Sequence, residues 1–353
     1  MQFGKKNRPL LGLDITTSSV KLIELSQSGK RYRVESYAAE PTPPNSINEK
    51  NIVDAQAVGG AIRRAVKRAA TKCKDVAIAI SGDAAITKVI QMPASLADKD
   101  LEGQVEIQAD QYIPFPMEEV SFDFEVIGPN ENDPDMNDVL LVATRTDNVD
   151  QRQAAVDAAG LSARVVDVEA FALENACQLL THQMPNGGVG QSVAVVDIGA
   201  SATTFSVLDD LKVIYTRDFA FGGVQLTEEI MRTYGLSMED AGRAKKEGGL
   251  PSNYQPEVLD PFIDDMTQQV SRSLQFYLAS GGGREQPDMI LVCGGCANIP
   301  GIADVISSRV GIPTEIGDPL GQMKVASKAK SQGVTKDSTA LLIACGLALR
   351  SFD

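Results

Sequence analysis

Residues 10–25 read "LLGLDITTSSVKLIEL", and residues 193–208 read "VAVVDIGASATTFSVL". In both, an apolar run is followed by Asp-Ile, then by small and hydroxylated residues, and then by a second apolar run. This pattern predicts two buried strands joined by a tight turn. Asp14 and Asp197 occupy the same place in the two copies. Because one copy opens each half of the chain, we expect two similar lobes with a cleft between them.

The composition bounds the size and class of the protein. The chain has 353 residues, of which 43% are hydrophobic and 23% charged, as in a globular protein of two domains or one lobed domain. Its 47 acidic and 33 basic residues give a net charge of −14, which argues against nucleic acid as a main partner. The sequence has no apolar run of about 18 residues and no signal-peptide core near its start, so we expect a cytoplasmic protein without a membrane-spanning helix.

Cysteine and histidine are too scattered for the common metal and nucleophile sites. The five cysteines are odd in number and predict no disulfide framework. Cys293-Gly-Gly-Cys296 has the spacing of a metal-binding pair, but no second pair follows and His182 is the single histidine. We therefore expect neither a zinc site nor a Ser-His-Asp or Cys-His catalytic site.

The region of residues 85–168 has a pattern of its own. A strand-like segment is followed by an acidic helix that stops at Pro114, an alternating strand and a polar loop, "NENDPDMND". A strand, a helix and another strand complete the region. This order is typical of a compact subdomain inserted into a larger fold.

The two repeated turns carry groups that bind phosphate. Backbone amides in such turns form a nest that attracts anions, and hydroxyls add further donors. The candidate residues are Thr16, Thr17, Ser18, Ser19 and Lys21 in the first copy, and Gly199, Ser201 and Thr203 in the second. Asp14 and Asp197 are suited to orient a hydrated Mg²⁺. One such stretch alone is usually only a turn, but two copies and a glycine-rich strand end, "VCGGCANIPG", predict a clamp around a polyphosphate.

This ordered set resembles the actin-like ATPase superfamily over essentially the whole chain. The resemblance implies a two-lobed α/β fold of the ribonuclease H-like type that binds ATP and Mg²⁺. It assigns residues 14–19 with Lys21 to the first phosphate hairpin and residues 197–203 to the second. The remaining site residues that it implies are Gly294, Gly295 and Asn298 for adenosine, Lys245 and Lys246 beside the adenine, and Glu169 where relatives keep a residue that orients the attacking water.

Within the superfamily, the inserted region resembles the subdomain of the FtsA and PilM families. The string "QADQYIPFPMEEVSFDFEVIG" is similar to PilM, and its residues 112–116 are the most discriminating in the chain. The resemblance implies four units. They are a first-lobe core (residues 1–84, completed by 169–185 and 338–353), an inserted subdomain (85–168), a second-lobe core (190–224 and 286–335) and a small second-lobe subdomain (225–285).

The PilM resemblance implies a scaffold of the inner-membrane platform that assembles type IV pili and serves twitching motility. The chain would bind the cytoplasmic amino-terminal tail of the membrane protein PilN in a groove beside the inserted subdomain, faced by residues 53–73, and link the membrane complex to cytoplasmic parts of the machine. The candidate groove residues are Ile113, Phe115, Phe122 and Phe124. For each of them, packing in the core of the subdomain is the alternative role, and the one that we favour. Pilus motor ATPases, other platform proteins and a second copy of the chain stay open as further partners.

Two positions depart from the superfamily pattern. Thr16 stands where relatives usually have glycine, and a Cβ there disfavours a positive φ and narrows the approach to phosphate. Ala200 stands where actin keeps an acidic residue, which removes a carboxylate that orients Mg²⁺ or water. Binding uses distributed donors whereas hydrolysis needs an aligned water, so we expect nucleotide binding with at most very slow ATPase activity.

Other functions remain open at this point. A sugar or acetate kinase of the same superfamily would need a carboxylate base at a second site, for which Asp167 is a candidate, although the inserted region does not resemble a kinase lobe. A filament former like FtsA is a third possibility, and a chaperone is disfavoured because no residues remain for a peptide-binding domain. The last residues, "ALLIACGLALRSFD", lack a basic amphipathic anchor, so we expect recruitment to the inner membrane through a transmembrane partner.

Overall fold

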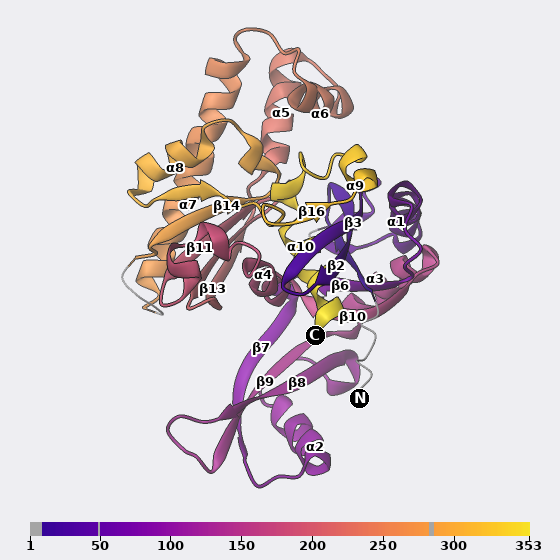
Figure 1. The fold of residues 1–353 in the computed structure, drawn as a ribbon, viewed down its shortest axis with the longest axis vertical. Coiled ribbons are helices and arrows are strands. Elements are labelled where there is room, and N and C mark those ends of the chain that lie inside the picture. The colour runs from indigo at the N-terminus through magenta and orange to yellow at the C-terminus, as the bar shows by residue number, and fades with distance from the viewer. Residues whose placement is uncertain (1–8, 49, 282–285) are drawn as a thin grey trace.

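The computed structural model describes residues 9–48, 50–281 and 286–353, and it consists of two lobes with an arm that extends from the first (Figure 1). The first lobe is built on a six-stranded sheet in the order β10-β6-β1-β2-β3-β16. Its strands are β1 (Leu11–Ile15), β2 (Ser19–Ser28), β3 (Arg31–Pro41), β6 (Asp75–Ile80), β10 (Ser162–Val168) and β16 (Lys324–Val325). A short hairpin of β4 (Ile47–Asn48) and β5 (Asn51–Ile52) follows β3 in the chain and precedes the first helix.

Helices cover both faces of the first sheet. Leu11 and Leu13 of β1 belong to one cluster with buried residues of α1 (Ala55–Ala69) and α3 (Thr146–Ala158), whereas Leu10 packs with Leu347 of α10 (Leu342–Leu349). Alternate residues of a strand point to opposite faces, which accounts for this division. Helix α1 begins where the side chain of Asp54 accepts a hydrogen bond from the backbone of Ala57 at 2.9 Å, and its apolar residues recur on one face.

The second lobe repeats the start of the first. Its five-stranded sheet has the order β13-β12-β11-β14-β15. The strands are β11 (Ser192–Ile198), β12 (Thr203–Asp209), β13 (Lys212–Phe219), β14 (Met289–Cys293) and β15 (Thr314–Ile316). β1 and β2 form an antiparallel hairpin with β6 parallel to β1, and β11, β12 and β14 have the same relationship. The duplicated sequence pattern therefore corresponds to a duplicated supersecondary unit.

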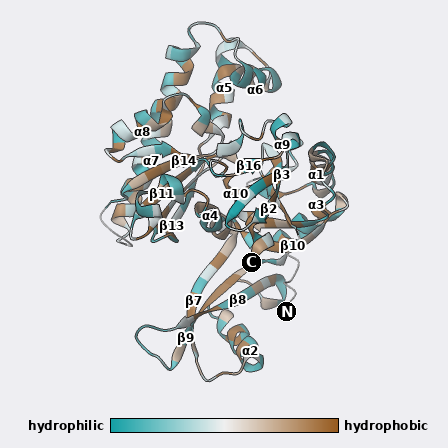
Figure 2. Cartoon of the chain, viewed as in Figure 1, coloured by the Kyte–Doolittle hydropathy of each residue, from teal (hydrophilic) through white to brown (hydrophobic). Residues whose placement is uncertain are grey.

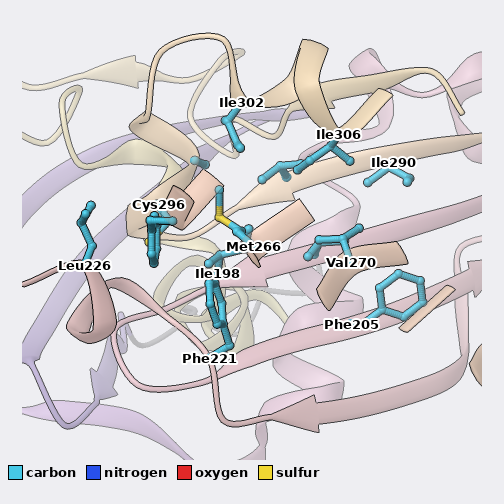
Figure 3. Packing of buried hydrophobic residues seen from close by; sticks show 14 of the residues in the cluster. Ile198, Phe205, Phe221, Leu226, Met266, Val270, Ile290, Cys296, Ile302 and Ile306 are labelled. Carbon is cyan, nitrogen blue, oxygen red and sulfur yellow. The ribbon is translucent and has the colours of Figure 1, made fainter. Parts of the chain in front are cut away.

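The helices of the second lobe enclose the largest apolar cluster. They are α5 (Gly223–Tyr234), α6 (Met238–Glu247), α7 (Asp260–Ala279) and α8 (Ile302–Val310), and a π-helical turn (Gln255–Leu259) precedes α7. Figure 3 shows Phe205 and Ile290 from the sheet beside Met266 and Val270 of α7. In Figure 2 the buried strands β11 and β14 carry hydrophobic colours, while α6 at the outer end is hydrophilic.

A helix crossing joins the two lobes. Helix α4 (Glu169–Cys177) follows β10 of the first lobe and packs with Val193 and Val195 of the second sheet. It also crosses α10, and at this crossing Gly346 lies so close to α4 that a Cβ would be 1.7 Å from the carbonyl oxygen of Ala172. A glycine is therefore required at position 346 for α4 and α10 to pack this closely. The packed helices connect the first lobe to the second.

The arm is a small α/β unit with its own core. Its antiparallel sheet has the order β7-β9-β8, and helix α2 covers one face. The elements are β7 (Ala85–Pro93), α2 (Asp98–Ala109), β8 (Val120–Pro129) and β9 (Met136–Arg145), and the polar loop predicted from the sequence joins β8 to β9. In Figure 1 the arm extends away from both lobes. The face of its sheet opposite α2 carries Val89, which is 50% exposed among the described residues, and is called the open face below.

The unit boundaries differ from those expected from the sequence. The expected insert of residues 85–168 includes α3 and β10, but α3 packs on α1 and β10 pairs in parallel with β6 of the first sheet. The expected second-lobe segment 286–335 includes β16, which pairs with β3 of the first lobe, and α9 (Ser327–Ser331), which contributes Ala329 to a first-lobe cluster. Both differences arise from long-range pairing, which leaves no local pattern in the sequence.

Candidate functional site

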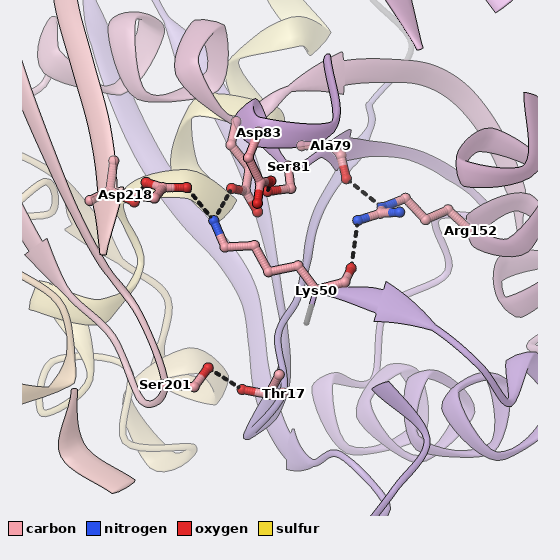
Figure 4. A network of polar contacts seen from close by, with 10 residues as sticks. Thr17, Lys50, Ala79, Ser81, Asp83, Arg152, Ser201 and Asp218 are labelled. Carbon is pink, nitrogen blue, oxygen red and sulfur yellow. Dashed lines mark hydrogen bonds and ion pairs between the residues drawn. The ribbon is translucent and has the colours of Figure 1, made fainter. Parts of the chain in front are cut away.

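The two repeated turns meet across the interlobe cleft. The hydroxyl oxygen of Thr17, in the β1–β2 turn, lies 2.8 Å from that of Ser201, in the β11–β12 turn. Figure 4 shows these side chains pointing toward one another from opposite walls. A group bound between the turns would therefore be contacted from both lobes.

The first turn is stabilised by its own side chains. The amide of Thr16 donates to the carbonyl oxygen of Ser19 at 3.0 Å, and the Thr16 hydroxyl oxygen accepts from the Ser19 amide at 3.2 Å. Thr42 donates to the carbonyl oxygen of Thr16 at 2.8 Å. Among the described residues, Thr16 is not one of those with a positive φ. The threonine therefore fits this turn without backbone strain, contrary to the conflict expected from its place in the sequence.

The second turn is held from behind by helix α5. The carbonyl oxygens of Gly199 and Ala200 accept hydrogen bonds from the amides of Gly223 and Val224 at 3.0 and 2.8 Å. Thr203 was predicted to face the cleft, but it is buried in the second lobe. Its hydroxyl donates to the carbonyl oxygen of Phe221 at 2.8 Å. The next residue faces the cleft instead, as the alternation of a strand requires.

A cleft of about 2140 Å³ between the lobes brings the other predicted residues together. Glu169 lies on its wall at the first turn of α4. The phosphate and magnesium candidates on the wall are Asp14, Thr16, Thr17, Ser18, Ser19, Lys21, Asp197, Gly199 and Ser201. The adenosine candidates on the wall are Lys245, Lys246, Gly294, Gly295 and Asn298. Residues that are distant in the sequence thus line one continuous space.

The adenosine candidates are fixed by hydrogen bonds. Gly294 has a φ of 87°, and a Cβ there would lie 2.3 Å from the carbonyl oxygen of Ile198. Its amide donates to the carbonyl oxygen of Thr339 at 2.7 Å, and the side-chain amide of Asn298 lies 3.2 Å from the Thr339 hydroxyl. The Lys245 ammonium donates to the Gly223 carbonyl oxygen at 2.7 Å, and burial lowers its pKa. These contacts preform one end of the cleft.

The acidic candidates lie in a shared electrostatic environment. Burial raises the pKa of Asp197 to about 6, which Lys21 opposes and Asp14 reinforces. Lys21 lies 2.7 Å from Asp14, and although burial alone would lower the pKa of Lys21, this ion pair raises it. Burial also raises the pKa of Glu169, only partly offset by Lys50. Carboxylates in such surroundings are stabilised by a cation.

Three residues of the cleft carried no signal in the sequence. The ammonium of Lys50 lies 2.5 Å from Asp218 of β13 and 3.5 Å from Glu169, so it bridges the two lobes (Figure 4). The Lys50 carbonyl oxygen accepts a hydrogen bond from the guanidinium of Arg152 at 3.0 Å. These residues come from a polar loop, a strand end and a helix, and no local motif links them.

The donor set fits a hydrated magnesium nucleotide better than a bare metal ion. Among the residues that the structure describes, no group of three or more His, Cys, Asp or Glu side chains could hold a metal ion. Asp14 and Asp197 supply carboxylate oxygens, and the two turns supply hydroxyls and amides. Mg²⁺ keeps several waters and is commonly held by one or two carboxylates together with phosphate oxygens, which matches this set. Cys293 and Cys296 are buried free thiols.

The groove candidates lie in the arm and take part in its core. Ile113 is 5% exposed and belongs to the buried cluster between α2 and the arm sheet. Phe115, Phe122 and Phe124 are partly buried and pack against the same cluster. Helix α1 packs on the first-lobe sheet, and in Figure 1 it lies away from the arm, so it does not form the expected facing wall.

Asp167, the candidate base of a kinase, has a structural partner. It is buried and lies 2.7 Å from the guanidinium of Arg350, and its other oxygen accepts a hydrogen bond from the amide of Val168 at 2.8 Å. Asp167 is also not among the residues that line the cleft. This carboxylate ties the C-terminal turn to the first lobe, which disfavours the kinase alternative.

Comparison with known proteins gives consistent matches over nearly the whole chain. The solved "PilM-PilN type IV pilus biogenesis complex" is 28% identical with a TM-score of 0.78 and covers 98% of this chain and 99% of that chain. Ethanolamine utilization protein EutJ from Carboxydothermus hydrogenoformans shares the fold at 18% identity and a TM-score of 0.56, covering 96% of this chain and 89% of its own. Cell division protein FtsA of Bacillus subtilis (strain 168) is 23% identical over an alignment of 363 positions, which covers 88% of this chain and 80% of FtsA.

These neighbours support the actin-like ATPase fold that the resemblance implied. A family model described as "Type IV pilus assembly protein PilM" matches residues 12–352. The chain therefore belongs to the PilM family of type IV pilus assembly proteins.

Proposed function

We propose that this chain is an ATP-binding scaffold of the type IV pilus assembly platform and that it binds the cytoplasmic amino-terminal tail of PilN. The observation that carries the proposal is the match to the PilM family over residues 12–352, together with the 28% identical relative that was solved as a complex with PilN. Both cover nearly the whole chain, so the proposal concerns both lobes and the arm.

Nucleotide binding is supported by the geometry of the cleft. The turns that contain Thr17 and Ser201 would bind the phosphates from both lobes. Asp14 and Asp197 would hold Mg²⁺ through water. A bound Mg²⁺ would supply charge neutralisation for the phosphates. The preformed end at Gly294 and Asn298 would receive the adenosine.

The same cleft favours slow turnover. Ala200 supplies no carboxylate at the second turn. Hydrolysis requires an aligned water, whereas binding uses many donors, so nucleotide would act here as a structural ligand.

The open face of the arm sheet suits an extended peptide. Val89 of β7 pairs with Leu140 of β9, which pairs with Glu125 of β8, so an apolar row ends at a carboxylate on the edge strand. Val89 is 50% exposed. Cytoplasmic segments next to membrane helices are enriched in Lys and Arg, so a chain with a net charge of −14 would attract such a tail. Phe115, Phe122 and Phe124 would support this sheet from its other face.

The proposed location follows from the partner. None of the helices in the described part of the chain has the length and apolar content to cross a bilayer. Binding to PilN would hold the protein at the cytoplasmic side of the inner membrane, where it would connect the membrane complex with the pilus motor and serve twitching motility.

Flotation with lipid vesicles tests this function. Vesicles that contain full-length PilN are expected to carry the protein to the top of a density gradient, whereas vesicles of the same lipids without PilN leave it at the bottom. Equal flotation with both kinds of vesicle would contradict recruitment through PilN, and flotation with neither would contradict the scaffold function.

A further inference from the structure

We propose that Lys50 binds the terminal phosphate of the nucleotide and that its ion pair with Asp218 occupies the ammonium until the phosphate arrives. The inference rests on the proposed nucleotide binding. It adds a phosphate-binding side chain that the repeated turns do not supply. It makes Lys50 the residue through which the cleft distinguishes a triphosphate from a diphosphate.

The backbone of Lys50 is held in an unfavourable conformation. Lys50 lies in the turn between β4 and β5 and has a φ of 69°. A residue other than glycine is uncommon in this left-handed region and persists only where the surroundings hold it there. Such strain at a cleft is a reason to look for a specific role of the side chain.

Arg152 ties the backbone of Lys50 to the first-lobe sheet. It is 5% exposed, and its guanidinium donates to the carbonyl oxygens of Lys50 at 3.0 Å and Ala79 at 2.9 Å (Figure 4). Ala79 belongs to β6, an interior strand of the first-lobe sheet. The turn is thus anchored to the sheet, and the Lys50 side chain is directed into the cleft.

The carboxylates of the cleft make the space around Lys50 negatively charged, and a bound polyphosphate would add further negative charge. Five carboxylates line the space beside the two turns, and they are Asp14, Asp83, Glu169, Asp197 and Asp218. Three cations lie near these carboxylates. Lys21 lies 2.7 Å from Asp14 on the same hairpin, so Asp14 already neutralises it, and the guanidinium of Arg152 is held by two backbone carbonyl oxygens. A polyphosphate would be repelled by these carboxylates unless a further positive charge compensated it. Lys50 is placed to provide that charge.

The ion pair of Lys50 is exchangeable. The side chains of Lys50 and Asp218 are 22% and 21% exposed, so a ligand in the cleft can reach them. The other oxygen of Asp218 accepts a hydrogen bond from Thr204 at 2.7 Å, which keeps Asp218 in position when Lys50 leaves. A lysine ammonium is a compact charge on a flexible stem, and it can turn from a carboxylate to a phosphate of higher charge.

Calorimetric titration with Mg²⁺-ATP and Mg²⁺-ADP tests the inference. Lys50→Gln is expected to lower the affinity for ATP by about tenfold or more and to change the affinity for ADP by less than about twofold, since a charged hydrogen bond to one phosphate is lost. Lys50→Arg should retain most of the ATP affinity. Asp218→Asn, which removes the competing carboxylate, should raise the affinity for ATP and not for ADP. Lys67→Gln on the exposed face of α1 is the matched control.

The outcomes separate the inference from the function on which it rests. An equal loss for ATP and ADP in Lys50→Gln, or no loss for either, overturns the role of Lys50 while nucleotide binding stands. Failure of the unaltered protein to bind either nucleotide overturns both. If Lys50→Gln does not fold, Asp218→Asn decides, because an unchanged ratio of the two affinities in that variant overturns the inference.

Discussion

Thr17 and Ser201 occupy the tips of the two repeated turns, and their hydroxyl oxygens lie 2.8 Å apart. The contact joins the first lobe to the second at equivalent points of the duplicated unit. Because both side chains are exposed to the cleft, the contact can open when a phosphate enters between them. The relationship therefore links the internal repeat of the sequence to the predicted binding site.

Removal of both hydroxyls should affect binding more than stability. For Thr17→Ala with Ser201→Ala we expect a change of less than about 1 kcal/mol in the free energy of unfolding, since the lost hydrogen bond is exposed. The affinity for Mg²⁺-ATP should fall several-fold. Denaturant unfolding and calorimetry measure the two effects, with Ser331→Ala at an exposed position of α9 as the control. A large loss of stability with unchanged ATP affinity would show that the contact is only structural.

Asp197→Asn should stabilise the protein in a pH-dependent way. The pKa of Asp197 is about 6 in the folded protein against an ordinary value of 3.8, so this carboxyl makes folding less favourable as pH rises through that window. At pH 7 to 8 the variant should gain about 1 to 3 kcal/mol in the free energy of unfolding, and the gain should vanish near pH 4. Affinity for Mg²⁺-ATP should fall in the same variant. A loss of stability at pH 8 would contradict this account of Asp197.

Gly346→Ala should disrupt the crossing of α4 and α10. The added Cβ would lie 1.7 Å from the carbonyl oxygen of Ala172, so the helices must separate. We expect a loss of about 2 kcal/mol or more in thermal or denaturant unfolding. Gly103→Ala in α2 is the matched control, because nothing lies within 4 Å of its added Cβ and the substitution should stabilise the helix by about 0.5 to 1 kcal/mol. Equal effects of the two substitutions would refute the close approach.

ATP turnover by the protein alone should be very slow. We expect a rate well below about 1 s⁻¹, the lower end for ordinary enzymes, because Ala200 supplies no carboxylate at the second turn. Glu169→Gln should lower the residual rate further while the affinity for ATP stays within about twofold. Single-turnover measurements with purified protein check both. A rate like that of a motor ATPase would be incompatible with a structural nucleotide.

The sequence predicted what depends on local pattern. The apolar runs on either side of the turns at Asp14 and Asp197 were sufficient to locate both hairpins, and the acidic helix before Pro114 marked the arm. These features could be predicted because a strand, a turn and an amphipathic helix are each defined by neighbouring residues.

The sequence did not predict what depends on distant pairing. The two residues of β16 show no strand pattern, and they join the first sheet only because β3 presents a free edge. Lys50 and Asp218 are far apart in the chain and ordinary in their segments, and their ion pair exists only when the lobes are together. Thr203 was misplaced because a turn that ends one residue earlier or later reverses which side chain faces the cleft.

The most direct test of the central claim is calorimetric titration of the protein with a peptide of the PilN amino-terminal tail. Saturable one-to-one binding is expected, and Val89→Glu on the open face of the arm should weaken it at least tenfold. Val189→Glu is the matched control, since Val189 is 63% exposed and lies between α4 and β11, outside the arm. Absence of peptide binding both with and without Mg²⁺-ATP would contradict the assignment as a PilN-binding scaffold.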